Sequence, residues 1–386
     1  MRLLEDTAAV RKRGAGRPVP VLLTSRELNL GGVERDVAKI ATGLDRSRFE
    51  PHVATFYEGG LRYEELRAAG IPILHLPMPS LVSPAAMKAG WHLFRYLKRN
   101  GIRLVHSYDA SGAFVAPVAR AARVPVVITS QLSYRTLLDP RTARVSRLSD
   151  RFAHAVLVNC EAVRRYMIES EGVPAGRVEL VYNGVDTAEF HPASEPKPEP
   201  LAGSDIVIGT VCVLRPEKAL TLLQEAFARV LPANPGMKLA IVGQGAERAR
   251  LVENAGRLGL GANFVLAPAT REVARWMRAI DIFVLPSYSE SFSNSLLEAM
   301  ACGCCVVGSR VGGTPELIGE NERGRLFEKG SADSLARELA ILIADPELRR
   351  ELGGKAARFA HSQLRLELAV ERTSALWDKL LDRALV

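Results

Sequence analysis

The sequence has no apolar run long enough to cross a membrane. No stretch of the 386 residues approaches about 18 consecutive apolar side chains, so we expect no transmembrane helix. The N-terminal stretch has no continuous apolar segment and carries Glu5 and Asp6, which argues against a secretory signal peptide. We expect roughly the first 17 residues to form a mobile, basic lead-in to the first strand.

Cysteine is also scarce. Five residues in a chain of this length are too few for a disulfide framework. Three of them cluster as Cys302, Cys304 and Cys305, a pattern that can suggest a metal site, but no second Cys or His pair with ligand spacing accompanies them. We therefore interpret the cysteines as small buried hydrophobes and expect a reducing, cytoplasmic location.

The composition is that of an ordinary globular protein, with 47% hydrophobic and 24% charged residues, and the length allows two domains. Its net charge of +8 is unevenly placed. Residues 1–190 hold 27 Lys and Arg against 19 Asp and Glu, whereas the remainder holds 24 against 24. The excess suggests that the first half faces an anionic partner or surface. A solvated basic surface without a partner is the alternative.

Strand and helix patterns alternate along most of the chain. In the first half, short apolar runs separated by helical periods predict strands at residues 19–24, 52–56, 71–76, 104–106, 124–129 and 155–159. Such alternation is typical of a parallel sheet covered by helices. The Pro-rich segment over residues 193–203 reads as a linker, and a second alternating series begins at residue 206.

One segment of the second half places two carboxylates close to a predicted helix N-terminus. Residues 282–285 read as a buried strand, and residues 294–301 as a helix with Ser293 as its N-cap. Glu290 therefore stands in the loop at a strand's carboxyl end, and Glu298 stands on the helix behind it. Ligands of open parallel sheets bind at those carboxyl ends.

Cations and glycines occupy comparable loops. Arg215 and Lys218 lie between a predicted strand and a helix, where they suit a diphosphate, although a surface ion-pair role is the alternative. Gly31-Gly32 opens a helix after the first strand, and Gly243-Gln-Gly245 follows a later one. Such glycines let backbone N–H groups approach an anion, but by themselves they indicate only tight turns.

These motifs together resemble the retaining glycosyltransferases of the family-4 type. The resemblance rests on Glu290 and Glu298 with seven residues between them, on the following EAMACG and GGTPE, and on GGVER, NGVD and the loop containing Arg215. It implies an α/β fold of the GT-B kind, with two Rossmann-like parallel-sheet domains facing each other across a cleft. The acceptor-side domain would span residues 1–190 and the donor domain residues 204–363. The last helix, over about residues 364–386, would pack back on the first domain.

The resemblance also implies roles for individual residues. Arg215 and Lys218 would stabilise the leaving diphosphate, while Glu290 would accept hydrogen bonds from the hydroxyls of the donor sugar and Glu298 from those of the ribose. The protein itself supplies the cations, and the sequence has no Asp-x-Asp run, so we expect neither a metal nor any cofactor besides the nucleoside-diphosphate sugar. The further donor-binding residues implied are Gly31, Gly32, Gly243, Gly245, Phe292, Ser293 and Asn294.

Two positions depart from the family. Where many members carry a histidine after the fourth predicted strand and another at the end of the next, this sequence has Tyr108 and Gln131. His106 lies nearby, within or at the end of a strand, where a structural role at the edge of the core is the alternative. We name His106, Tyr108 and Gln131 as acceptor-side candidates.

The function implied is that of a retaining, metal-independent hexosyltransferase that uses a lipid-linked or saccharide acceptor in cell-envelope or extracellular-glycan synthesis. Basic and aromatic residues at helical spacing over residues 88–99 suggest a peripheral position on an anionic membrane surface, at the inner face of the plasma membrane. An ordinary crossover helix is the alternative there. Nothing indicates a nucleic acid partner. A glycosidase is disfavoured by the Arg215 loop. A nucleotide-sugar epimerase, or a non-catalytic module that binds sugar nucleotides or membranes, remains open.

Overall fold

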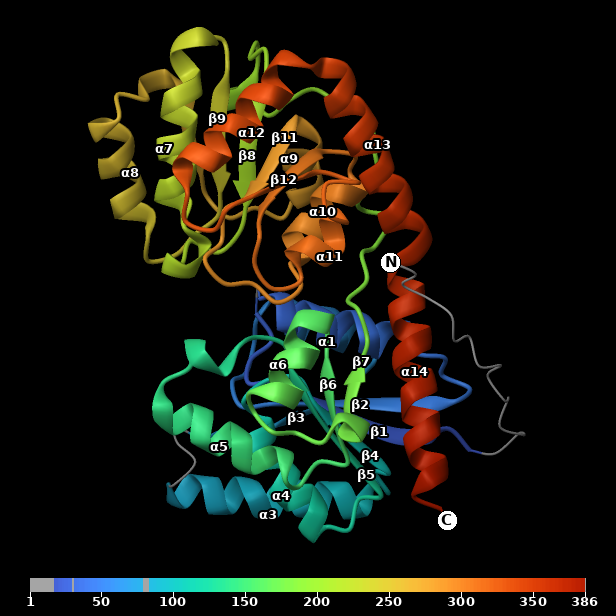
Figure 1. Ribbon diagram of the computed structural model, residues 1–386. Helices are drawn as coiled ribbons and strands as arrows, with labels where there is room; N and C mark the ends of the chain where they lie inside the picture. The colour runs from blue at the N-terminus through green and yellow to red at the C-terminus, as the bar shows by residue number, and fades with distance from the viewer. Residues whose placement is uncertain (1–16, 30, 79–82, 386) are drawn as a thin grey trace. The chain divides into compact units, whose positions relative to one another are not determined.

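The computed structural model describes residues 17–29, 31–78 and 83–385, and these residues form two compact units (Figure 1). The first unit contains the chain up to residue 159, residues 164–181 and the chain from residue 367. The second unit contains residues 160–163 and 182–366. Apart from its last residue, the expected basic lead-in lies outside the described residues. Within those residues, no helix combines the length and apolar character needed to span a bilayer.

The first unit is built on a seven-stranded parallel sheet in the order β3-β2-β1-β4-β5-β6-β7. From β1 the chain first moves outward to β3, then crosses to β4 and continues to β7. Because crossover connections are right-handed, the first two helices cover one face of the sheet and the next four cover the other. The strands are β1 (Val19–Thr24), β2 (Phe49–Thr55), β3 (Ile73–His75), β4 (Leu104–Ser107), β5 (Val126–Gln131), β6 (Ala155–Val158) and β7 (Val178–Leu180).

Seven helices belong wholly or mainly to this unit, counted over the described residues. The C-terminal helix joins it from Glu367 onward, and its Trp377 ring is buried edge-on against Phe49 at 5.5 Å. The helices are α1 (Gly32–Gly43), α2 (Leu61–Ala68), α3 (Pro84–Arg99), α4 (Gly112–Ala121), α5 (Pro140–Asp150), α6 (Glu161–Glu169) and α14 (Leu366–Arg383).

The second unit is built on a six-stranded parallel sheet in the order β10-β9-β8-β11-β12-β13. Its strands are β8 (Val207–Val211), β9 (Lys238–Val242), β10 (Phe264–Ala267), β11 (Ile282–Leu285), β12 (Cys305–Ser309) and β13 (Arg325–Phe327). Its helices are α7 (Leu220–Val230), α8 (Arg248–Arg257), α9 (Val273–Ala279), α10 (Asn294–Ala301), α11 (Thr314–Ile318), α12 (Ala332–Ala344) and α13 (Pro346–Gln363).

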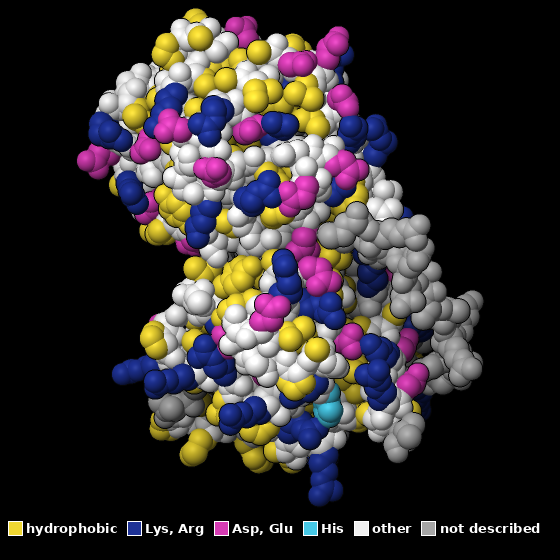
Figure 2. All heavy atoms as spheres, in the orientation of Figure 1, with side chains coloured by type: hydrophobic (Ala, Val, Ile, Leu, Met, Phe, Trp, Pro, Cys, Tyr) yellow, Lys and Arg dark blue, Asp and Glu magenta, His cyan; other side chains and the backbone are white. Residues whose placement is uncertain are grey.

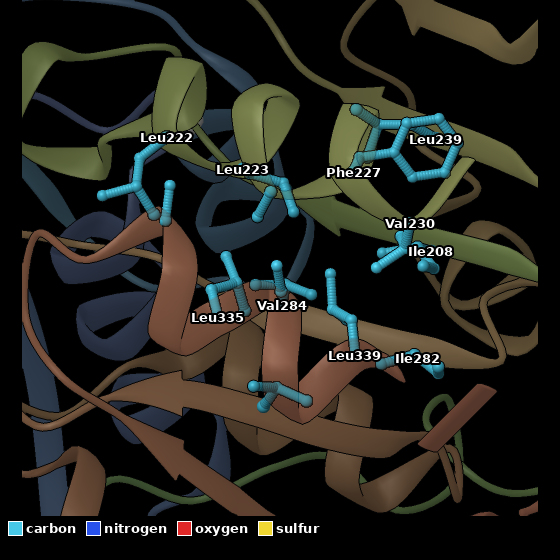
Figure 3. Packing of buried hydrophobic residues seen from close by; sticks show 14 of the residues in the cluster. Ile208, Leu222, Leu223, Phe227, Val230, Leu239, Ile282, Val284, Leu335 and Leu339 are labelled. Atoms are coloured by element: carbon cyan, nitrogen blue, oxygen red, sulfur yellow. The ribbon is translucent and has the colours of Figure 1, made fainter. Parts of the chain in front are cut away.

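The core of the second unit shows why its strands read as continuous apolar runs. Helices α7 and α12 lie side by side on one face of the sheet, and their leucines meet β-branched residues of the strands (Figure 3). Helices cover both faces of a parallel sheet, so no side of a central strand is left for polar residues. Labelled members of this core are Ile208, Leu222, Leu223, Phe227, Val230, Leu239, Ile282, Val284, Leu335 and Leu339.

The helix predicted over residues 294–301 is confirmed as α10, and the Oγ of Ser293 accepts the Leu296 N–H as its cap. The basic stretch from Arg135 to Arg151 contains helix α5, which Asp139 caps and Pro140 starts. Helix α11 is not predicted by the sequence patterns, because it is a single short turn after a glycine pair, too brief to produce a period.

A buried ion network ties α5 and α6 to the loop after β5. The Arg135 side chain, only 1% exposed, forms ion pairs with Asp150 and with Glu171, and its Nε donates to Ser146. Glu171 also accepts hydrogen bonds from Arg147 and from the Tyr166 hydroxyl. Paired charges thus hold these elements of the first unit together.

We predict that Glu171 makes the stability of the protein fall in acid. Burial alone would raise the pKa of Glu171, but hydrogen bonds from Arg147, Tyr166 and Arg135 lower it from 4.5 to about 2. Its contribution is therefore complete above about pH 4.5 and is lost as the pH falls toward 2, on the order of 2 kcal/mol after allowance for solvent screening.

Urea unfolding at several pH values measures this effect. Glu171→Gln should be less stable than the wild type at pH 7, and the difference should shrink as the pH falls from 4.5 to 2. The matched control is Glu169→Gln, an exposed residue at the end of α6 and two positions before Glu171, which should follow the wild type. Parallel pH profiles for wild type and Glu171→Gln would contradict the prediction.

Candidate functional site

The strand order of the second unit fixes where its ligand site lies. From β8 the chain proceeds to β9 and β10 on one side of the sheet, and from β11 it proceeds to β12 and β13 on the other. The loops that leave neighbouring strands β8 and β11 therefore diverge at their carboxyl ends, which is where open parallel sheets bind ligands. The first loop carries Arg215 and Lys218, and the second carries Glu290.

Lys218 and Glu290 join these two loops. Lys218 Nζ lies 2.6 Å from Glu290 Oε2, and the two side chains are only 18% and 13% exposed. The hydroxyl of Ser287 donates to the same carboxylate oxygen at 3.2 Å. Burial by itself would lower the pKa of Lys218, but the Glu290 carboxylate, with smaller help from Cys212 and Glu217, raises it above its usual value. The lysine is therefore a fixed cation at this switch point.

Arg215 differs from Lys218 in that it is not held in place. Its side chain is 64% exposed, and the carboxylate with which it pairs, that of Glu217, lies 3.9 Å away. An exposed guanidinium this loosely paired keeps its hydrogen-bond donors available for an anion. The structure thus provides one cation fixed by Glu290 and one that is free to turn toward a ligand.

A glycine pair on another loop holds the backbone around Glu290. Gly312 has a φ of +51°, and a Cβ atom there would lie 1.7 Å from the carbonyl oxygen of Glu290. Its neighbour Gly313 donates its N–H to the Ser291 carbonyl at 2.7 Å. Glycine is required here for close approach between two backbones, and the approach fixes the position of Glu290.

The Gly243-Gln-Gly245 turn likewise allows close approach between two backbones, here to the loop that carries Arg215 and Lys218. Cβ atoms at Gly243 and Gly245 would lie 1.9 Å and 2.3 Å from the carbonyl oxygens of Cys212 and Leu214. These glycines therefore pack against the loop that carries Arg215, and a role in binding the nucleotide stays a prediction.

Ala219 stands where the family has glycine and adopts a left-handed conformation with φ +50°. That conformation costs a residue with a Cβ about 1 kcal/mol.

Helix α10 positions the remaining donor-side candidates. Asn294 Oδ1 accepts a hydrogen bond from Asn183 Nδ2 at 2.9 Å, and Phe292 is buried with its ring 5.3 Å from that of Tyr182. Glu298 is buried on the same helix among apolar neighbours. A carboxylate is rarely buried without a specific need, and this placement marks Glu298 as functional or structurally paired.

Sequence reasoning missed the roles of Glu316, Tyr182 and Asn183. The Glu316 carboxylate accepts hydrogen bonds from the N–H groups of Glu161 and Ala162 at 3.0 Å and 2.9 Å, and from the Tyr182 hydroxyl at 3.1 Å. Burial is the first cause that raises the pKa of Tyr182, and the charge of Glu316 adds to it. The available signal was that Asn183 lies inside NGVD, Tyr182 directly before it and Glu316 inside GGTPE, but these motifs do not show the side-chain contacts.

In the first unit, Gly31 and Gly32 form the start of α1, as predicted. A Cβ at Gly31 would lie 1.7 Å from Glu34 Oε2, so the carboxylate of the helix's own first turn lies beside this glycine. An anion that binds at this end of α1 has to displace that carboxylate. The part of Gly31 and Gly32 in donor binding stays a prediction.

The three acceptor-side candidates lie at the ends of β4 and β5, all buried. The His106 ring is packed 4.1 Å from that of Tyr108, its Nε2 lies 2.8 Å from Ser130 Oγ, and burial lowers its pKa to about 3. Burial likewise raises the pKa of Tyr108, and the Gln131 amide donates to the Ser133 carbonyl. His106 is therefore a neutral core residue, and an acceptor role for the three stays a prediction.

The switch point of the first unit, between β1 and β4, is held by Asp109. Its carboxylate accepts hydrogen bonds from Ser25 Oγ, from the Arg26 N–H at 2.7 Å and from the Ser111 N–H at 2.8 Å. No local pattern indicates the link from Asp109 to Ser25 and Arg26, because these residues are more than 80 positions apart in the sequence. It fixes the two loops that border any ligand at this end of the first unit.

The described residues contain no group of three His, Cys, Asp or Glu side chains close enough to hold a metal ion. All five cysteines are free thiols. Cys302, Cys304 and Cys305 are buried, and burial is the main cause that raises the pKa of each thiol. The interpretation of this cluster as small buried hydrophobes agrees with these positions.

Comparison with known protein families identifies the family of this chain. The family model described as "Glycosyltransferase Family 4" matches residues 30–189, and that of "Glycosyl transferases group 1" matches residues 193–359. The chain belongs to the family-4 glycosyltransferases. The two matches adjoin at the segment that links the two sheets in the sequence.

Relatives and solved structures agree with that family. D-inositol 3-phosphate glycosyltransferase of Segniliparus rotundus is 30% identical over 207 residues, 51% of this chain and 46% of the relative. N-acetyl-alpha-D-glucosaminyl L-malate synthase of Bacillus anthracis is 29% identical over 211 residues, 54% of this chain and 55% of the relative. The chain thus spans about half the length of these curated relatives. Anabaena Alr3699/HepE, solved with UDP and glucose, aligns with a TM-score of 0.83 at 21% identity over 94% of this chain and 100% of the other. This likeness and the two parallel-sheet units confirm the predicted GT-B fold.

We predict strong coupling between Lys218 and Glu290. Lys218→Met leaves a nearly buried carboxylate and Glu290→Gln a nearly buried ammonium, so each should lower the free energy of unfolding by about 1–3 kcal/mol. The double variant should recover most of that loss, and a double-mutant cycle in urea measures it. The exposed pair Lys355 and Glu351 is the control, with an expected coupling below about 0.5 kcal/mol. Coupling no larger than in the control would refute the prediction.

A second prediction concerns Gly312. Gly312→Ala adds left-handed strain and a clash with the Glu290 carbonyl, and should lower the free energy of unfolding by about 2–4 kcal/mol. Gly261 is the matched control because its φ is +48° and no atom lies within 4 Å of its added Cβ. Gly261→Ala should lower stability by about 1 kcal/mol, from strain alone. Equal losses for the two variants in urea unfolding would show that the contact with Glu290 is unimportant.

Proposed function

We propose that this family-4 glycosyltransferase transfers a hexose from a nucleoside-diphosphate sugar to an acceptor, with retention of the anomeric configuration and without a bound metal. The observation that carries the proposal is the pairing of Lys218 with Glu290 across the β8/β11 switch point, beside the exposed Arg215. This places a fixed cation, a second cation and an acidic hydrogen-bond acceptor at the end of the sheet where ligands bind.

The chemistry of the reaction explains the need for these groups. As the bond to the sugar breaks, negative charge grows on the leaving diphosphate and positive charge grows on the anomeric carbon. Cations held in advance near the diphosphate stabilise the transition state more than the ground state. Lys218 and Arg215 would do so, which removes the need for a metal. Glu290 would orient the sugar through its hydroxyls.

The donor class has support from the relatives. The name D-inositol 3-phosphate glycosyltransferase describes a transferase of sugars, and the aligned Alr3699/HepE structure contains UDP and glucose. Retention is what the family-4 resemblance implies. The buried Glu298, by the same resemblance, would accept hydrogen bonds from the ribose of the nucleotide.

For the acceptor and the location, we propose a lipid-linked or saccharide acceptor in cell-envelope or extracellular-glycan synthesis, and a cytoplasmic protein at the inner face of the plasma membrane. The five free thiols fit a reducing compartment. The basic first half of the chain fits an anionic membrane surface. A non-catalytic module is the second candidate, favoured by Tyr108 and Gln131 where many family members carry histidines.

One assay separates these functions. The purified protein is incubated with radiolabelled UDP-, GDP- and ADP-sugars and a membrane extract, with and without EDTA. Label that moves to lipid or glycan in the presence of EDTA is the expected result, and NMR of the product gives the anomeric configuration. Label that stays on an altered soluble sugar would indicate an epimerase, and binding without turnover would indicate a module. Either of the last two results overturns the proposal.

We predict that Glu298→Gln lowers kcat/KM for the donor at least about tenfold, about 1.4 kcal/mol in transition-state stabilisation. The substitution keeps the side-chain volume, so the loss should come from the missing carboxylate. Glu351→Gln, on the exposed surface of α13, is the control and should keep wild-type turnover. Circular dichroism and thermal unfolding check that both variants fold. Wild-type kcat/KM in Glu298→Gln would remove this residue from the site.

A further inference from the structure

Helix α3 has two faces of opposite character. Its inner face buries Ala86, Ala89, Leu93 and Leu97 in the core of the first unit, against strands and α4. These residues recur at helical spacing, as in an ordinary crossover helix. The inner face of α3 is therefore that of an ordinary crossover helix. Packing of a crossover helix does not explain the residues of the outer face.

The outer face of α3 exposes apolar and basic side chains together. Met87 is 79% and Trp91 is 55% exposed, and the Arg95 guanidinium lies over the Trp91 ring, 4.6 Å from its centroid. With about 100° of rotation per residue, the exposed side chains fall within an arc of roughly 140°. We call these residues the outer face of α3: Met87, Lys88, Trp91, Arg95, Lys98 and Arg99.

The charge around this face is predominantly positive. Residues 83–151 contain twelve Lys and Arg against three Asp, a net charge of +9, whereas the whole chain carries +8. No glutamate occurs between Glu65 and Glu161. Within the described chain no carboxylate forms an ion pair with Lys88, Arg95, Lys98 or Arg99. All of the protein's excess positive charge thus belongs to the segment that forms α3, α4 and α5.

Helix α5 extends the basic surface beyond α3. Helix α4 packs against both α3 and α5, and the right-handed crossovers place all three on one face of the sheet. Dark blue and yellow side chains dominate over these helices in Figure 2, with little magenta. Besides Thr136, Asp139 and Pro140, the residues that α5 and its preceding loop expose are Leu137, Arg141, Arg144, Arg147 and Leu148, followed by Arg151.

We propose that the outer face of α3 docks on the surface of an anionic lipid bilayer. Lys88, Lys98 and Arg99 meet the headgroups, and each cation near an anionic surface strengthens binding about fivefold. Met87 and Trp91 enter the boundary between headgroups and acyl chains, the depth at which tryptophan is enriched in membrane proteins. Exposed apolar side chains at the centre of a basic face favour a bilayer over nucleic acid, whose backbone attracts cations but not a methionine.

This docking deepens the proposed function. Its value to the protein rests on that function, because the membrane would contain the acceptor. If the protein transfers sugar to a lipid-linked acceptor, binding through α3 keeps the first unit at the surface that contains that acceptor. The vesicle measurement itself uses no donor and no sugar transfer. Failure of docking and failure of the transferase proposal are therefore separate results.

Tryptophan fluorescence provides the test, because the chain has three tryptophans and only Trp91 is exposed. The full chain is titrated with vesicles of phosphatidylglycerol and phosphatidylcholine, or of phosphatidylcholine alone. We expect emission to shift to shorter wavelength and protein to co-sediment with the anionic vesicles alone, with weaker binding at high salt. Trp91→Phe should lose the spectral shift and keep most of the sedimentation.

Charge variants show whether the outer face of α3 is responsible for binding to the anionic vesicles. Lys88→Gln with Arg99→Gln should weaken binding to the anionic vesicles about 25-fold. Arg46→Gln with Arg67→Gln is the matched control: it removes the same charge from the first unit, on the side of α1 and α2, and should bind like the wild type. Circular dichroism verifies that each variant is folded.

Three results would overturn the proposal. They are the absence of co-sedimentation with anionic vesicles at low salt, binding without any spectral shift from Trp91, and equal weakening by the two pairs of charge variants. Binding of the wild type to RNA, lost in the Lys88 and Arg99 variant while vesicles are not bound, would assign the face to nucleic acid instead and would also overturn it.

Discussion

The ion pair between Lys218 and Glu290 is the interaction on which the candidate site depends. It connects the loops after β8 and β11, which the strand order sends in opposite directions, and it is nearly buried. Two charges at such a depth are stable only together, since each one alone would face a large desolvation penalty. The pair therefore holds an acidic acceptor and a cation in fixed positions before any ligand arrives, while Arg215 remains exposed and free to respond to one.

Close backbone contacts hold that pair in place. Gly312 lies directly against the carbonyl of Glu290, and Gly243 and Gly245 lie against the loop that leads to Arg215. The glycines of this site thus act chiefly by letting loops touch, which differs from a simple anion-binding turn. Glycine is not present at every strained position of these loops, since Ala219 adopts a left-handed conformation although it has a Cβ atom. The family resemblance supplied the motifs, and the contacts explain why their spacing matters.

The sequence predicted the fold class and most elements because the strands are buried on both faces and the helices have an apolar side. It failed where the pattern is interrupted. Strand β2 starts at Phe49, before the predicted residue 52, because Glu50 and Pro51 break the apolar run. Helix α11 is too short to produce a helical period. The links through Asp109 and Glu316 join residues far apart in the sequence, and no local pattern records such partners. Glu290 and Lys218 were named as candidates, but their direct pairing was not predicted.

The two units also differ in how they use charge. In the second, cations and carboxylates are balanced, and the cation that matters most, Lys218, is neutralised by Glu290 until a ligand competes for it. In the first, the buried charges are paired, as Arg135 is with Asp150 and Glu171, whereas the cations on the outer face of α3 form no ion pair with a carboxylate among the residues that the structure describes. An unbalanced exposed charge adds nothing to folding stability and persists only at the expense of self-repulsion. Its place on a face that also exposes Met87 and Trp91 is therefore best explained by an external anionic surface, which would relieve that repulsion on contact.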